Sequence, residues 1–172
     1  PDPLLTLEPH RRVTLREAFG VDSDMTVPCF AERDSHVAVW LVLDCSASMA
    51  EPSRSVDGLD KLAYARMLLG CVAAIAQRQG DAFGLVVLGG GKVAFTEASR
   101  GPRHLQRVLA QLQRAEPAGS LPDAETLKAS LHFAQSPSAI YAASDLLDWP
   151  SPLSIALTRL RQMRHDVRVL GL

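Results

Sequence analysis

Hydrophobic residues after position 36 alternate between short continuous runs and helical stripes. Residues 37–43, VAVWLVL, are rich in β-branched and aromatic side chains, a pattern typical of a buried strand. Residues 59–79 follow, closed by Gly80, and predict a helix that ends at a glycine. Their stretch LLGCVAAIA is apolar on nearly every face, so we expect this helix to pack against a sheet.

A second apolar run leads into a hairpin. Residues 83–88 predict another strand, the glycines at 89–91 predict a turn, and residues 93–96 predict a short return strand. Helical stripes and short apolar runs then alternate again along the rest of the chain. We expect helices that begin at Pro102, Pro122 and Pro152, and strands at residues 139–143 and 167–172.

This alternation of strands and helices indicates an α/β fold. It favours a parallel sheet that is covered by helices on both faces. In such sheets ligands bind beyond the carboxyl ends of the strands, near the switch in strand order. Asp44 and Asp145 both follow predicted strands, although they are far apart in the sequence. We therefore expect these two carboxylates to meet at one edge of the sheet.

Composition and charge argue against several classes of protein. The chain has 172 residues, which fits one domain with a substantial core. Its 18 Lys and Arg residues balance 19 Asp and Glu residues, so nothing favours nucleic acid or an anionic membrane surface as a partner. The longest apolar run, residues 67–76, is shorter than the roughly 20 residues that span a membrane. The first residues also lack the features of a signal peptide.

Cysteine usage indicates the compartment. Cys29, Cys45 and Cys71 are odd in number and show no Cys-x-x-Cys spacing. This pattern argues against a disulfide scaffold and against a zinc site. A reducing compartment fits best, and we expect the protein to be cytoplasmic.

The N-terminal part of the chain carries no clear pattern. Residues 13–19 are compatible with a helical turn, and residues 26–31 with an extended segment despite Pro28. If the strand at 37–43 is central, both of its edges are already paired. We therefore expect residues 1–36 to wrap around a domain that is formed by residues 37–172.

The residues after the first predicted strand suggest a metal site. Asp44, Ser46 and Ser48 have the spacing Asp-x-Ser-x-Ser, and a tight loop can turn alternating residues toward one point. Hard cations such as Mg²⁺ prefer oxygen ligands of this kind. Because hydroxyls are neutral, such an ion would keep positive charge and attract a carboxylate from outside. The pattern therefore fits a docking site for an acidic side chain.

The same residues carry a family resemblance. The stretch DCSASM resembles the metal-ion-dependent adhesion site of von Willebrand factor A domains. The long helix, GDAFGLVVLGGGKVAF and then SDLLD follow in the same order, so that residues 31–172 resemble the bacterial family called domain of unknown function 58. Members of that family often work beside MoxR-type AAA+ ATPases. They usually continue past the last strand, so we expect this chain to be part of a longer protein.

The resemblance implies a fold, a cofactor and a partner. The implied fold is a three-layer, Rossmann-like von Willebrand A domain, with a mostly parallel sheet and one antiparallel edge hairpin strand. The implied cofactor is Mg²⁺ or Mn²⁺, and the implied partner is a protein that offers an Asp or Glu to the metal, such as a MoxR-type AAA+ ATPase or its substrate. The metal ligands carried over are Asp44, Ser46 and Ser48 from the first motif and Asp145 for the later aspartate.

One position departs from the family pattern. The threonine that the family places between the two motifs has no clean match. Ser120 stands at that place, whereas Thr126, the nearest threonine, lies inside a predicted helix. We expect Ser120 to complete the site, because a serine hydroxyl can do the same job. Ser120 and Asp123 also loosely resemble a capping box for the helix that begins at Pro122.

The residues of this motif also allow other interpretations. Asp and Ser are favoured at turns and helix starts because they bond backbone N–H groups. A phosphohydrolase with Asp44 as nucleophile would need a second carboxylate where Ser46 stands. Cys45 as nucleophile would need a base that lowers its pKa, so a packed thiol is the simpler reading. We expect a metal-dependent protein-interaction module and no enzyme, with the phosphohydrolase or a structural domain with an inactive metal site as alternatives.

Overall fold

The computed structural model describes residues 12–14, 26–28, 37–53, 58–130, 136–147 and 150–172. The chain forms two compact units, residues 1–35 and 36–172. In the first unit, β1 (Arg12–Thr14) pairs antiparallel with β2 (Thr26–Pro28). Residues 26–28 are extended, as expected. A helical turn was expected at residues 13–19; its first two residues lie in β1 instead, and the others lie outside the described residues. That residues 1–36 wrap around the domain stays a prediction.

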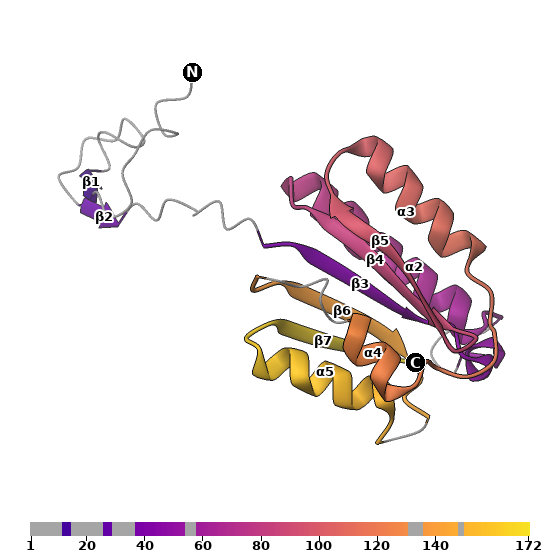
Figure 1. The fold of residues 1–172 in the computed structure, drawn as a ribbon. Helices are drawn as coiled ribbons and strands as arrows, with labels where there is room; N and C mark the ends of the chain where they lie inside the picture. The colour runs from indigo at the N-terminus through magenta and orange to yellow at the C-terminus, as the bar shows by residue number, and fades with distance from the viewer. Residues whose placement is uncertain (1–11, 15–25, 29–36, 54–57, 131–135, 148–149) are drawn as a thin grey trace. The chain divides into compact units, whose positions relative to one another are not determined.

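The second unit is built on a five-stranded sheet, shown in Figure 1, with the order β5-β4-β3-β6-β7. Strand β3 lies in the centre and runs parallel to both of its neighbours, and β6 and β7 are also parallel. Only β5 runs antiparallel, as the return strand of the expected hairpin. The bounds are β3 (Val39–Asp44), β4 (Phe83–Gly89), β5 (Lys92–Ser99), β6 (Ala139–Ser144) and β7 (Asp166–Gly171).

Helices cover both faces of this sheet (Figure 1). Side chains alternate along β3, so Leu41 packs with α2 and α3 on one face, and Val42 with α4 and α5 on the other. Double coverage explains why every residue of β3 is buried. The three-layer α/β fold is thus confirmed. The bounds are α2 (Lys61–Gln79), α3 (Pro102–Arg114), α4 (Ala124–Ser130) and α5 (Pro152–Gln162).

Capping residues set the ends of helices α2 and α5, one on each face of the sheet. Helix α2 begins after Asp60, whose side chain accepts a hydrogen bond from Ala63 N, and ends at Gly80 in the left-handed conformation. Helix α5 begins after Ser151, which forms a reciprocal capping box with Ser154. The chain continues from β3 to β4 and β5 on one side of it in the sheet, and then to β6 and β7 on the other side. The switch in strand order therefore falls between β3 and β6.

The packing of α2 on the sheet generates a stability prediction. Leu69 is fully buried in the core between α2 and β3, whereas Met67 on the same helix is 57% exposed. Leu69→Ala should lower the free energy of unfolding by about 2–5 kcal/mol, because it leaves a cavity. Met67→Ala, the matched control, should change it by less than about 0.5 kcal/mol. Urea unfolding of both variants is the measurement, and equal losses would contradict the packing described here.

Candidate metal centre

A cleft of about 580 Å³ lies at the carboxyl edge of the sheet, where β3 and β6 end side by side. Asp44 is the last residue of β3, and Asp145 follows β6. The switch in strand order thus opens the cleft where sheets of this type bind ligands. All the metal ligands predicted from the sequence line it: Asp44, Ser46, Ser48, Ser120 and Asp145.

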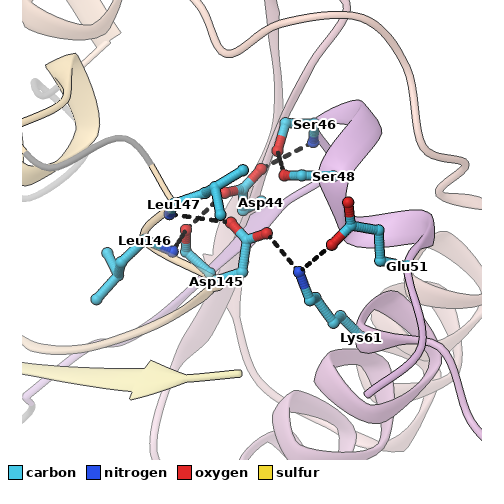
Figure 2. Close-up of polar contacts among 9 residues, drawn as sticks. Asp44, Ser46, Ser48, Glu51, Lys61, Asp145, Leu146 and Leu147 are labelled. Carbon is cyan, nitrogen blue, oxygen red and sulfur yellow. Dashed lines mark hydrogen bonds and ion pairs between the residues drawn. The ribbon is translucent and has the colours of Figure 1, made fainter. Parts of the chain in front are cut away.

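The carboxylate of Asp44 is held by two hydrogen bonds inside the protein (Figure 2). Its Oδ1 accepts from the backbone N of Ser46 at 2.8 Å, and its Oδ2 accepts from the hydroxyl of Ser144 at 2.6 Å. Asp44 is only 1% exposed, so these donors replace the water that a buried carboxylate loses. Sequence reasoning missed Ser144. Its place at the end of the neighbouring strand was the signal that could have found it.

The two serines of the motif lie close together above Asp44. Residues after β3 form a short 3-10 helix, η2 (Ala47–Ala50), which Met49 anchors in the core. The hydroxyls of Ser46 and Ser48 are 3.2 Å apart. Ser46 precedes η2, but its side chain makes no capping hydrogen bond. The turn interpretation therefore holds for Asp44, which accepts from a backbone amide, and fails for Ser46.

Ser120 reaches the cleft because its loop is bonded to two other segments. Backbone amides of Gly90 and Gly91, in the hairpin turn, donate to carbonyls of residues 118–120 at 2.6 and 2.9 Å. On the other side, the same loop exchanges backbone hydrogen bonds with Cys45 and Ala47 at 2.8 and 2.9 Å. Both glycines have positive φ, which L side chains rarely adopt. The hairpin and the motif loop together fix the position of Ser120.

The capping role suggested for Ser120 is wrong. Helix α4 begins at Ala124, not at Pro122, and the side chain of Asp123 accepts from the backbone N of Thr126 at 2.7 Å. Asp123 is therefore the cap, and the carbonyl of Ser120 is tied to the hairpin instead. Thr126 does not line the cleft. Of the two candidates for the missing threonine, the structure thus brings only Ser120 to the site.

A buried lysine adds a charge that sequence reasoning missed (Figure 2). The Nζ of Lys61 donates to Glu51 Oε2 at 2.8 Å and to Asp145 Oδ2 at 3.0 Å. These bonds, that to Glu51 first, raise the pKa of Lys61. Burial acts to raise the pKa of Asp145, but hydrogen bonds from Lys61 and Ser48 outweigh it, so that this pKa is lowered. The signal was a lysine at the first position of a helix that is apolar over most of its length.

Cys45 is unsuited to nucleophilic chemistry. It is 1% exposed, and burial, followed by the nearby charge of Asp44, raises the pKa of its thiol to about 12. A thiol with so high a pKa forms almost no thiolate near neutral pH. The structure thus supports a packed thiol at this position.

The donor set of the cleft fits a hard divalent cation. Two carboxylates and three hydroxyls are all oxygen donors, which suit Mg²⁺ or Mn²⁺ and not a soft metal. Within the described ranges, no group of three or more His, Cys, Asp or Glu side chains could hold a metal ion. The candidate site differs from such a group because serines supply most of its donors.

Comparison with known families identifies the family to which the chain belongs. The family model described as Protein of unknown function DUF58 matches residues 25–170. The chain belongs to the DUF58 family. A second model, Cobaltochelatase CobS subunit N terminal, matches residues 4–37 of this DUF58 protein. A search of curated proteins found no match.

Solved structures support the fold of the DUF58 domain. The conserved hypothetical protein BatB from Bacteroides thetaiotaomicron is 19% identical, with a TM-score of 0.60 over 78% of this chain and 66% of that chain. An aerotolerance-related membrane protein from Bacteroides fragilis NCTC 9343 is 18% identical, with a TM-score of 0.60 over 78% and 67%. The SpRpn10 VWA domain is 11% identical, with a TM-score of 0.53 over 78% and 74%.

These likenesses show a von Willebrand A-like fold. The chain spans about two thirds of the length of the BatB structure, 66%. In the part of the chain that the structure describes, no helix has both the length and the apolar character to cross a membrane.

The environment of Cys45 generates a labelling prediction. Native protein treated with iodoacetamide at pH 8 should be modified at Cys71, which is exposed, and not at Cys45. Adding denaturant should make Cys45 reactive, because burial is the main cause of its raised pKa. Peptide mass spectrometry before and after denaturation is the measurement. Similar labelling rates at both cysteines in the native protein would show that the thiol of Cys45 is accessible.

Proposed function

We propose that this DUF58 domain is a metal-dependent protein-interaction module that binds Mg²⁺ or Mn²⁺ in the cleft. The observation that carries the proposal is the convergence of Asp44, Ser46, Ser48, Ser120 and Asp145 on one cleft. These residues come from three separate segments, the end of β3 with its loop, the loop of Ser120 and the loop after β6, and each segment is fixed by hydrogen bonds to backbone groups. Carboxylate and hydroxyl oxygens gathered in this way are the ligands that a hard divalent cation prefers.

The charge of the site supports an acidic partner. Asp44 and Asp145 supply the only negative charges among the proposed ligands, and the serines are neutral. A divalent cation with so few charged ligands remains electrophilic and has room for one more oxygen ligand. A carboxylate from outside, an Asp or a Glu, would complete its coordination. We therefore propose that the partner offers such a side chain to the metal.

The walls of the cleft support a protein as the source of that carboxylate. Besides the polar groups, the cleft is lined by Leu121, Pro122, Leu146 and Leu147. Leu147 is 65% exposed, so it offers an apolar surface beside the polar groups of the cleft. An acidic residue within a polypeptide could bring apolar neighbours onto these walls. A small acid would leave them in water.

An AAA+ ATPase is the kind of partner that we propose. The match of residues 4–37 is to the N terminus of the cobaltochelatase CobS subunit, which is related to AAA+ ATPases. This match lies in the same chain as the DUF58 domain, which supports an adaptor role beside a MoxR-type AAA+ ATPase or its substrate. A cytoplasmic place of action, as expected from the cysteines, is part of this proposal.

The phosphohydrolase alternative has less support. Asp44 as nucleophile would need a general acid two residues later, and that residue is Ser46. We therefore propose that the domain is not an enzyme. A structural domain with an inactive metal site remains as the outcome that the metal titration can reveal.

The proposed ligands generate a binding prediction. Asp44→Asn should weaken Mg²⁺ binding by at least about 10–100-fold, while the amide keeps the shape of the buried group. Ser120→Ala should also weaken binding, and Thr126→Ala, the matched control, should leave it unchanged. Isothermal titration calorimetry with MgCl₂ is the measurement. Equal affinities for wild type and Asp44→Asn would refute the metal site, and loss of binding in Thr126→Ala alone would show that Ser120 was wrongly assigned.

The proposed partner generates a second prediction. A MoxR-type AAA+ ATPase from the same cell should be retained by the immobilised protein with Mg²⁺, lost with EDTA, and regained when Mg²⁺ is restored. Leu147→Ser should weaken retention without changing Mg²⁺ affinity. Ile155→Ser on α5, where the side chain is 61% exposed, should change neither retention nor Mg²⁺ affinity. No phosphatase turnover should accompany binding. Retention that is insensitive to EDTA would favour the structural domain, and turnover lost in Asp44→Asn would favour the enzyme.

A further inference from the structure

Lys61 is a buried cation beside the proposed metal ligands. It is the first residue of α2, yet it is only 6% exposed. Lysine is seldom buried unless it is paired, because its ammonium loses hydration. Here the ammonium has a carboxylate on each side, Glu51 at 2.8 Å and Asp145 at 3.0 Å. A positive charge therefore already stands at the edge where a metal ion would bind.

The hydrogen bonds of Asp145 place this charge in competition with a metal. Its Oδ2 accepts from Lys61, and its Oδ1 accepts from the backbone N of Leu147 at 3.3 Å. A cation bound to Asp145 would therefore share the carboxylate with the ammonium or take its place. Sharing is unfavourable, because a unit charge and a divalent charge a few ångströms apart repel each other strongly.

Glu51 offers the ammonium a second position. The Glu51 side chain is 61% exposed, whereas that of Asp145 is 4% exposed and faces the cleft. The backbone N of Lys61 also donates to the carbonyl of Glu51 at 2.9 Å, which keeps the two residues together. The ammonium can thus leave Asp145 and remain paired with Glu51, without any movement of the backbone of α2.

We propose that the ammonium of Lys61 is an internal cation, which neutralises Asp145 when the cleft holds no metal and moves to Glu51 alone when a divalent cation binds. This inference rests on the proposed metal site. It assigns Lys61 a positioning role that lowers the affinity for metal and stabilises the metal-free domain. Binding in the cleft would then be an exchange of one cation for another.

The test compares wild type with Lys61→Met, which keeps an unbranched side chain only one atom shorter and removes its charge. Lys61→Met should bind Mg²⁺ and Mn²⁺ about tenfold more tightly in calorimetry, since the competing charge is gone. In EDTA its melting temperature should be lower than that of wild type, because Asp145 and Glu51 lose their counter-ion. Saturating Mg²⁺ should close most of that gap.

Three further variants keep the test sharp. Lys61→Arg retains the charge and should bind Mg²⁺ no more tightly than wild type. Lys128→Met removes an equal charge from the exposed face of α4 and should leave affinity unchanged. If Lys61→Met does not fold, Lys61→Gln replaces it, because an amide can still donate to Asp145 without carrying charge.

The outcomes distinguish failure of this inference from failure of the proposed function. If wild type binds Mg²⁺ and the neutral Lys61 variants bind equally or more weakly, the inference is overturned and the metal site stands. If neither wild type nor the variants bind, both fall. Binding that appears only in the neutral variants would support the inference and would show that Lys61 blocks the site in the wild-type protein.

Discussion

A carboxylate at the end of a fully buried strand must find hydrogen-bond donors inside the protein, and this constraint organises the edge of the sheet. Asp44 finds them in the backbone N of Ser46 and the hydroxyl of Ser144. The first bond stabilises the turn after β3 that places Ser46 and Ser48 at the cleft. The second joins β3 to the end of β6, just before Asp145. One buried charge thus connects the two loops that supply the proposed ligands.

The third loop reaches the same cleft through backbone hydrogen bonds. Residues 118–120 lie between the hairpin turn after β4 and the segment that follows Asp44, and they bond to both. Gly89 is needed at this junction, because a Cβ there would meet the carbonyl oxygen of Cys45 at 2.8 Å. The glycines at 89–91, which the sequence predicts as a hairpin turn, therefore also allow three loops to pack together. Their arrangement leaves the hydroxyl of Ser120 at the cleft without a capping role.

Electrostatics then set what the cleft can hold. The carboxylates of Asp44, Asp145 and Glu51 stand against one ammonium, that of Lys61, so the group carries a net negative charge. Such a group attracts a cation, and because the serines are neutral, a divalent cation bound there would keep part of its positive charge. The exposed leucine at the rim adds an apolar contact for whatever brings the next carboxylate. In the function proposed here, metal binding, partner binding and the position of Lys61 are linked through Asp145.

The sequence by itself determined the order of strands and helices, the antiparallel hairpin and the edge at which Asp44 and Asp145 meet. It could do so because a strand that is buried on both faces, such as β3, needs a continuous run of apolar residues, and because neighbouring parallel strands end at the same edge of the sheet. Only the tertiary structure decided that Asp123, and not Ser120, caps α4, since a cap depends on where the helix begins. The same holds for Ser144, Glu51 and Lys61. Their hydrogen bonds join different elements of the structure, and the periodic pattern of apolar residues carries no information about such bonds.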